Sequence, residues 1–243
     1  MDRPAGWRGI VGLVKPTFRS GPLEEVIRLL PEGIGVIPLH VGVRGGTDEE
    51  FRAAIKTAGE RVGELATMGV DYILVNGAPP PMFLGYPKDH HLAKQLTEQH
   101  GIPVELDTMV LLNAFKVMKM KKVIFMSYTA GGQNDIFTKY LRDAGLNVVE
   151  TVAVEASSFS GASFIQPTDV FRAAKKAYLE HPEADGIYML GGAWRVLGII
   201  ETLEKDLGTT VLAGTQLTLW AILKALHVGE PIPGYGKLLT EAV

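Results

Sequence analysis

The sequence predicts an α/β protein made of two similar lobes with mainly parallel sheets. Short apolar segments alternate with segments that carry apolar residues at helical spacing, which is typical of repeated βαβ units. Most apolar segments are nearly continuous rather than alternating, as expected for strands that are covered on both faces. Two blocks of sequence also recur in the same order, which indicates a duplicated half.

The apolar segments define the predicted strands. Each is short and rich in aliphatic residues, and turn-forming residues follow most of them. The predicted strands are Gly9–Lys15, Gly33–Val41, Asp71–Gly77, Lys122–Tyr128, Asn147–Glu155, Gly186–Gly192 and Thr209–Gly214.

The clearest predicted helix follows the second of these strands. Thr47 and Glu50 have the spacing of a capping box. After them, apolar residues recur at helical spacing and form one face, made of Phe51, Ile55, Ala58, Val62 and Leu65. Later in the chain we expect Thr168 or Asp169 to cap another helix, whose apolar residues are Val170, Phe171, Ala174 and Tyr178.

The duplicated half consists of two strand-and-helix blocks. The segment MGVDYILVNGAPPP is similar to PEADGIYMLGGAWR, and GIPVELDTMVLLNAF is similar to GTTVLAGTQLTLWAI. Any two βαβ units share some features, but here the order of both blocks is kept. We therefore expect two intertwined lobes, one of residues 1–116 and 217–243 and the other of residues 117–216. A ligand site would lie in the cleft between them, beyond the carboxyl ends of the strands.

Composition narrows the functional class. The 243 residues carry a formal net charge of −3 with no long run of one sign, so we expect neither nucleic acid nor a membrane as partner. There is no apolar signal-peptide core at the N-terminus and no apolar run near the ~20 residues of a membrane span, which predicts a cytoplasmic protein. The absence of cysteine excludes a disulfide framework and a thiolate zinc site.

Two matching turns follow equivalent strands of the repeat. One contains Asn76, Gly77 and Ala78, and the other contains Gly191 and Gly192. Glycine lets the backbone approach a ligand closely, and N–H groups at the start of a following helix can hold an anion. If the turns face each other, backbone donors from both would hold a carboxylate or an enolate oxygen. Ordinary turn glycines are the simpler alternative.

Other strand ends carry hydroxyl and amino groups. Tyr128 could donate a hydrogen bond to an oxyanion or act as an acid, and an amphipathic tyrosine at a sheet edge is the alternative. Its neighbours Ser127 and Thr129 are further hydroxyl donors. The first strand ends in Lys15, Pro16 and Thr17. Pro16 forces a turn, Lys15 and Thr17 could meet a carboxylate, and a solvated lysine is the alternative.

The histidines give little support for a metal site. His90 and His91 are adjacent, so on a helix they point in different directions and make a poor ligand pair. His40, at the end of a predicted strand, is the more interesting single residue. No phosphate-binding glycine motif follows a strand, and GxSxG is absent. We therefore predict no metal and no nucleotide.

Beyond these patterns, the sequence resembles the aspartate/glutamate racemase superfamily, and within it the arylmalonate decarboxylase and maleate cis-trans isomerase branch. The resemblance spans nearly the whole chain and rests on the segments GIVGLVKPT, GVRGGTDEEF, GVDYILVNGA, SYTAGGQND, DGIYMLGGA and PIPGYGKLL. It implies two Rossmann-like lobes related by a pseudo-twofold axis, and chemistry that needs no cofactor.

The resemblance also implies catalytic cysteines, which this chain lacks. In the family they follow two equivalent strands, and here those positions hold Gly77 and Gly191. Racemisation by two facing cysteines and isomerisation by thiolate attack are thus excluded. The positions that resemble the family's oxyanion pocket are Gly77, Ala78, Pro79, Tyr128, Gly191 and Gly192, and Thr215 could replace a missing hydroxyl donor.

The resemblance implies an enzyme that acts on a small carboxylate as a decarboxylase, lyase or isomerase and stabilises an enediolate or a similar anion. We assign catalysis to Tyr128, Asn76 and His40, and the proton donor stays open between Tyr128, Lys15, His40 and a bound water. An apolar arm on the substrate is expected because one side of the predicted pocket is apolar, with Val41, Val43, Pro79, Pro80, Phe83, Leu84 and Trp194.

Two other functions stay open. A protein that has lost the family thiols could bind a small carboxylate without turning it over. A hydrolase could instead activate a water molecule with His40 or Asp107. The sequence also leaves open whether the chain forms a homo-oligomer.

Overall fold

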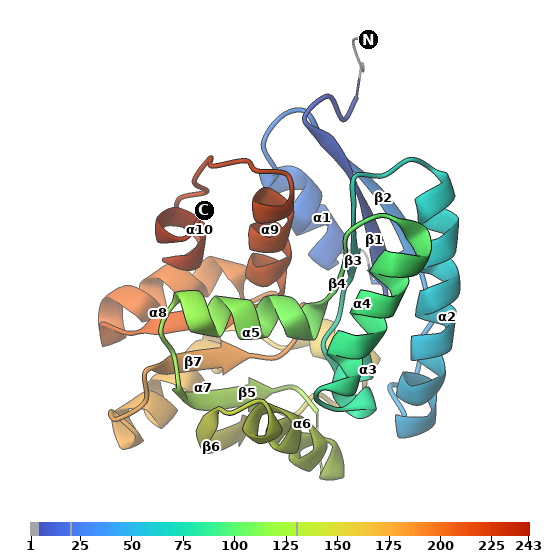
Figure 1. Cartoon of the computed structure of the whole chain (residues 1–243). Helices are drawn as coiled ribbons and strands as arrows, with labels where there is room; N and C mark the ends of the chain where they lie inside the picture. The colour runs from blue at the N-terminus through green and yellow to red at the C-terminus, as the bar shows by residue number, and fades with distance from the viewer. Residues whose placement is uncertain (1–4, 20, 130) are drawn as a thin grey trace.

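The computed structural model describes residues 5–19, 21–129 and 131–243. In this part of the chain, two four-stranded sheets, each wholly parallel, are flanked by helices (Figure 1). The strand orders are β2-β1-β3-β4 and β6-β5-β7-β8, so each sheet uses its strands in the same sequence-relative order. The predicted α/β class with two similar, parallel-stranded lobes is confirmed.

The first sheet is built from the N-terminal half of the chain. Its strands alternate with helices that return the chain to the same edge of the sheet, as parallel pairing requires. The elements are β1 (Gly9–Lys15), α1 (Gly21–Leu29), β2 (Ile34–His40), α2 (Asp48–Thr67), β3 (Tyr72–Val75), α3 (Pro79–Leu84), α4 (Lys88–His100), β4 (Val104–Leu106) and α5 (Asp107–Val117).

The second sheet repeats the pattern. Two short 3₁₀ helices, Ser160–Phe164 and Leu197–Ile199, interrupt the connections on either side of β7. The elements are β5 (Lys122–Ser127), α6 (Gly132–Asp143), β6 (Asn147–Ala153), α7 (Pro167–Glu180), β7 (Gly186–Met189), α8 (Ile200–Leu207), β8 (Thr210–Ala213), α9 (Gly214–Ala225) and α10 (Leu238–Glu241).

Each predicted strand corresponds to an observed one, but all except β1 end one to three residues earlier than expected. β3 stops at Val75 and β7 at Met189, so the glycine turns lie outside the sheets. Gly77 and Gly191 have φ values of +97° and +70°, which no strand residue adopts and which glycine accommodates without strain. The backbone therefore turns away from both sheets at the positions where the sequence places the site.

The helix predictions were right at α2 and wrong at the start of α7. The Thr47 hydroxyl accepts a hydrogen bond from Glu50 N at 3.2 Å, and the Glu50 carboxylate accepts one from Thr47 N at 3.2 Å, which completes the capping box. Helix α7 begins at Pro167 with Gln166 as N-cap, before either predicted cap at Thr168 or Asp169. Proline favours the first helical position because its φ is fixed near the helical value and its missing N–H would have no partner there.

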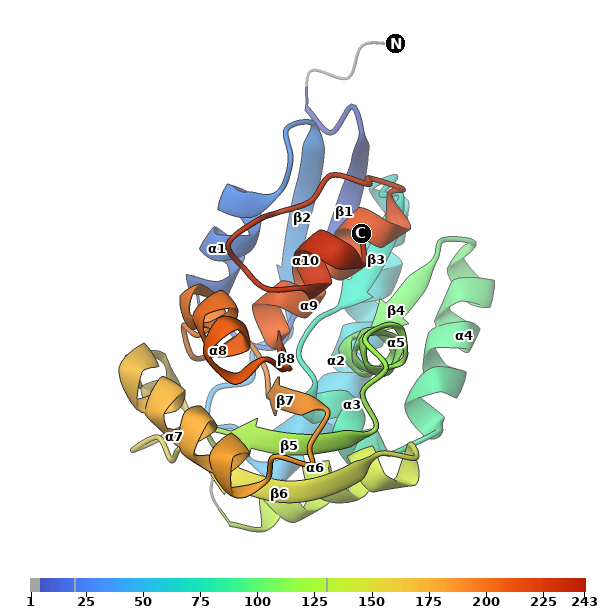
Figure 2. The same cartoon turned by 90° about the vertical axis from the view of Figure 1, so that its left-hand side faces the viewer.

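The two sheets share one hydrophobic core. It joins residues of the first sheet such as Leu13 and Leu74 to residues of the second such as Phe125 and Leu212. Figures 1 and 2 show α5 between the two sheets, and α9 contacts α5, β3 and β8. The division into residues 1–116 with 217–243 and residues 117–216 stays a prediction. In the described residues, no helix is both long and apolar enough to cross a membrane.

Candidate active site

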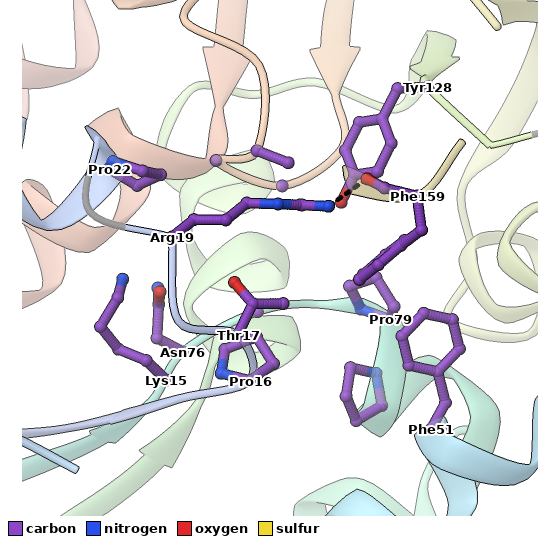
Figure 3. Close-up of a pocket in the computed structure, with 15 residues that line it drawn as sticks. Lys15, Pro16, Thr17, Arg19, Pro22, Phe51, Asn76, Pro79, Tyr128 and Phe159 are labelled. Carbon is purple, nitrogen blue, oxygen red and sulfur yellow. Dashed lines mark hydrogen bonds between the residues drawn. The ribbon is translucent and has the colours of Figure 1, made fainter. Parts of the chain in front are cut away.

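The carboxyl ends of β1, β3, β5 and β7 converge on a cavity of about 50 Å³ between the two sheets (Figure 3). In Figure 3, Lys15 and Asn76 lie at one end of this cavity, and Phe51, Phe159 and Pro79 lie at the other. Most of the predicted site residues line it, namely Lys15, Pro16, Thr17, Asn76, Gly77, Tyr128, Gly191 and Gly192. We refer to this space as the main cavity.

A second cavity of about 20 Å³ lies next to the main cavity. The two share Lys15, Asn76, Gly77 and Gly192 among their lining residues. Thr215, which the sequence also predicted, lines this smaller space rather than the main cavity. We call it the inner cavity.

Lys15 lines both cavities and is 5% exposed. Burial lowers the pKa of its ammonium group from 10.5 to about 8, and the negative charge of Asp107 opposes this shift. Lys15 is the last residue of β1, and its carbonyl accepts a hydrogen bond from Val41 N at 2.8 Å. Lys15 can therefore change its protonation state near neutral pH.

Asp107 is the buried carboxylic acid of the site. It is the first residue of α5, is 2% exposed and lines the inner cavity. Burial raises the pKa of Asp107 from 3.8 to about 7, while hydrogen bonding from Gly77 N and the charge of Lys15 oppose the rise. Its Oδ2 accepts a hydrogen bond from Gly77 N at 3.1 Å, and its Oδ1 has no partner among the described residues.

This hydrogen bond corrects the expectation that both glycine turns offer free backbone donors. The N–H of Gly77 points at the Asp107 carboxylate, so the first turn already holds an anion of the protein itself. Asn76 is engaged as well, because its Nδ2 donates to the Thr218 hydroxyl at 2.7 Å. Ala78 is fully buried at the start of α3 and lies outside the main cavity wall.

The second glycine turn keeps its donors available. Gly192 and Ala193 line the main cavity, and their N–H groups make no hydrogen bond to any residue in the described part of the chain. The turn starts where Leu190 N donates to Met126 O at 2.8 Å, which fixes the end of β7 against β5. Two adjacent backbone donors without a protein partner at a cavity wall are a candidate anion-binding site.

Arg19 and Tyr128 meet at the main cavity. The Tyr128 side chain is 6% exposed, and burial raises the pKa of its hydroxyl, whereas the hydrogen-bonded guanidinium of Arg19 opposes that rise. Arg19 also donates to the carbonyl of Phe159 and lies 4.4 Å from the centre of its ring. Figure 3 shows the guanidinium pointing across the cavity toward Tyr128. The predicted donor Tyr128 is thus in place beside a cation.

Sequence reasoning missed Arg19. It lies four residues beyond the end of β1, in a segment without regular structure, and nothing in its spacing sets it apart from a solvated surface arginine. The available signal was its position in the turn after a predicted strand that ends in Lys15.

Besides Ala78, three further predicted residues line neither of the two cavities. Ser127 and Thr129 donate their hydroxyls to the amide oxygen of Asn134 in α6, the latter at 2.8 Å, so both hydroxyls already have a partner. His40 stacks on Phe18 with ring centres 5.2 Å apart, and its pKa is lowered by burial and by the charge of Lys15. We therefore do not include these three side chains in the site.

The apolar end of the main cavity differs in part from the predicted one. Pro79 and Pro80 line it as expected, together with Phe51 and Phe159. Phe83 instead packs against Phe51 and Phe137 in the core, and Trp194 packs against Tyr128. Val41, Val43 and Leu84 also lie outside the cavity lining.

The two positions that the sequence resemblance equates with the family cysteines differ in the space around them. A Cβ atom at Gly77 would lie 2.6 Å from Cγ of Pro16, whereas at Gly191 the nearest atom would be the Tyr128 hydroxyl at 3.3 Å. A side chain at position 77 would therefore displace the first turn from Pro16. Within the described residues, no group of three or more histidine, aspartate or glutamate side chains could hold a metal ion.

Comparisons with known proteins show what this chain is similar to. The arylmalonate decarboxylase family model matches residues 11–239. Arylmalonate decarboxylase of Bordetella bronchiseptica is 19% identical over 233 residues, which cover 96% of this chain and 97% of that protein. Maleate isomerase of Geobacillus stearothermophilus is 21% identical over 250 residues, with coverage of 95% and 96%.

The solved structures show the same fold. A cysteine-to-serine variant of Nocardia farcinica maleate cis-trans isomerase, with a covalently bound succinylcysteine intermediate, superposes with a TM-score of 0.88 at 20% identity. The match covers 96% of this chain and 98% of that one. That relative carries its intermediate on a cysteine, and this sequence has none. The family match over nearly the full length establishes that the chain belongs to the arylmalonate decarboxylase family.

Proposed function

We propose that the protein is a cofactor-independent enzyme that acts on a small carboxylate and stabilises an enediolate or a similar anion without a thiol. Relatives in the family are named as a decarboxylase and an isomerase, and one solved relative contains maleate. The observation that carries the proposal is the pairing of Arg19 and Tyr128 in the main cavity, opposite the free donors of the second glycine turn. A cation, a hydroxyl and backbone N–H groups together suit an anion whose charge grows during the reaction.

The substrate would bind with one carboxylate between Arg19 and the N–H groups of Gly192 and Ala193. A guanidinium binds a carboxylate through two parallel hydrogen bonds, which fixes the orientation as well as the position of the ligand. The remainder of the substrate would then extend toward the apolar end of the cavity, against Phe51 and Pro79. A volume of about 50 Å³ restricts the bound group to a few heavy atoms unless the Arg19–Phe159 contact opens.

The chemistry follows from where the donors lie. Loss of carbon dioxide or of an α-proton leaves an electron pair that spreads onto the remaining carboxylate as an enediolate. Tyr128 and the second turn can donate to that oxygen, and the nearby charge of Arg19 stabilises it further. Because burial and the neighbouring protein charges leave the pKa of the Tyr128 hydroxyl raised, the group stays protonated and remains a donor at neutral pH.

The test is turnover of dicarboxylates followed by product analysis. Malonate, phenylmalonate and maleate are incubated with the enzyme, and products are identified by proton NMR. We expect Arg19→Gln and Tyr128→Phe each to lower kcat/KM roughly 100-fold, because each removes one donor to the anion. Arg142→Gln and Tyr178→Phe, on α6 and α7, serve as matched controls. Unchanged turnover in both site variants would contradict the proposed role of this cavity.

A non-catalytic carboxylate-binding protein is the second candidate. The absence of any cysteine favours it, since a relative carries its covalent intermediate on that residue. It predicts saturable binding of a dicarboxylate by calorimetry, with no product after long incubation. Hydrolysis with Asp107 acting on a water molecule is the third, and ester substrates added to the same assay would detect it. The expected cytoplasmic location and a homo-oligomer stay predictions.

A further inference from the structure

The proposed reaction needs a proton donor to replace the missing thiol, and two buried ionisable groups meet at the inner cavity. We propose that Lys15 and Asp107 form this proton-donating couple, with Lys15 delivering the proton to substrate carbon and Asp107 resupplying Lys15. The inference rests on the proposed function, because it takes the substrate to be a small carboxylate in the main cavity. The inference adds the proton donor that converts the enediolate to product.

The cavities place Lys15 between the substrate and Asp107. Lys15 lines both spaces, whereas Asp107 lines only the inner one. A proton can thus pass from Asp107 to Lys15 on the inner side, and from Lys15 to the substrate on the outer side. Asn76 and Gly77 also border both spaces, and Asp107 does not line the main cavity.

A structural ion pair does not account for these two groups. In the described part of the chain, no carboxylate oxygen lies within 4.0 Å of the Lys15 ammonium, and Oδ1 of Asp107 has no hydrogen-bond partner. A buried pair kept for stability is held in contact, because only close contact offsets the loss of hydration. Here the two groups instead border the same 20 Å³ space. That volume holds one water molecule, which needs two or more polar partners.

The charges around the couple support transfer in this direction. Burial lowers the pKa of Lys15 to about 8 and raises that of Asp107 to about 7, so both change protonation near neutral pH. The negative charge of Asp107 also acts to raise the pKa of Tyr72, Tyr128 and Tyr188. The positive charge of Lys15 acts to lower the pKa of His40. Arg19 is a second cation that lines the main cavity together with Lys15.

The step balances without an outside reagent other than a solvent proton. The enediolate electron pair forms a C–H bond at the α-carbon while an N–H bond of Lys15 breaks, which leaves a neutral amine. The protonated carboxyl of Asp107 then passes its proton through the inner-cavity water to that amine. The resulting carboxylate takes up one proton from solvent, which closes the cycle.

Substitutions at Lys15 separate proton donation from charge. Lys15→Arg keeps the positive charge but cannot release a proton near neutral pH, and Lys15→Gln removes the charge. We expect both to lower kcat at least 100-fold while the Kd for malonate, measured by calorimetry, changes less than 10-fold. Circular dichroism checks folding, and the exposed Lys94→Gln is the matched control.

The pH profile provides a readout that a structural role would not move. The wild-type rate should fall as pH rises through about 8, where Lys15 loses its proton. Because the charge of Asp107 raises the pKa of Lys15, Asp107→Asn should move this falling limb to lower pH. Asp143→Asn, on the surface of α6, should leave it in place. If the falling limb of the pH–rate profile does not move in Asp107→Asn, the proposed Lys15–Asp107 couple is overturned.

The outcomes distinguish this inference from the proposed function. Full turnover in Lys15→Arg or Lys15→Gln overturns the couple and leaves the proposed enzyme intact. Wild-type protein that binds dicarboxylates and converts none of them overturns the proposed enzyme, and the couple with it. Turnover that is lost in both Lys15 variants, with binding retained and the shifted limb in Asp107→Asn, supports both.

Discussion

Lys15 is a single residue of the site whose buried ammonium group lowers the stability of the folded protein. The residue is 5% exposed, and its amino group makes no ion pair in the described part of the chain. Its pKa is lowered by burial, so the folded state disfavours the ammonium form relative to the unfolded chain. A side chain kept at this position against stability is typical of a functional site.

Lys15→Met should therefore stabilise the protein while abolishing activity. At pH 7 the ammonium is charged in both states, so removing it should raise the free energy of unfolding by about 2 kcal/mol. The wild type should recover stability as pH rises from about 8 to 10.5, because the unfolded chain stays protonated over that window while the folded protein does not. Urea denaturation at pH 7 and near the upper end of that window measures the free energy of unfolding of both proteins. The advantage of Lys15→Met over the wild type should be smaller at the higher pH. A Lys15→Met protein less stable than wild type at pH 7 would contradict this account, with exposed Lys94→Met as the control.

Single residues also mark where sequence reasoning reached its limit. Tyr128 and the two glycine turns could be placed, because each follows a predicted strand and strand ends of parallel sheets share one edge. Arg19 could not, since the direction of a long side chain depends on loop backbone that no periodicity encodes. Nor could the sequence show that Gly77 N is taken by Asp107, a residue 30 positions away.

The glycine turns are the elements that define the site. Both leave their strand through a positive φ, yet they differ in what surrounds them. The first turn packs on Pro16 and donates to Asp107, and the second faces Tyr128 with open donors. The repeat in sequence therefore predicts matching turns correctly but not their separate roles, which depend on neighbours from other parts of the chain.

Gly77→Ala tests how tightly the first turn is fixed. The new Cβ would lie 2.6 Å from Pro16 Cγ, and the φ of +97° is itself strained for alanine. We expect a loss of about 3 kcal/mol in the free energy of unfolding, as the sum of backbone strain and overpacking. Gly145→Ala is the matched control, because its φ is +91° with no atom within 4 Å, and should lose only about 1 kcal/mol. Equal losses would show that Pro16 yields easily.

At the scale of the whole molecule, the cavity exists because two parallel sheets direct their carboxyl ends at each other. A hydrophobic core common to both sheets and the shared helices α5 and α9 hold the sheets together (Figure 2). This arrangement could be predicted from the sequence, because continuous apolar strands and a repeated block order imply it. The size of the cavity could not, since it depends on which side chains close it.

The most direct test of the central claim is a crystal structure of the protein grown with malonate. The account predicts a malonate carboxylate in the main cavity, within hydrogen-bonding distance of the Arg19 guanidinium and of the N–H groups of Gly192 and Ala193. Its α-carbon should face Lys15. Malonate bound outside this cavity, with the Arg19–Tyr128 pair undisturbed and no ligand beside the second glycine turn, would contradict it.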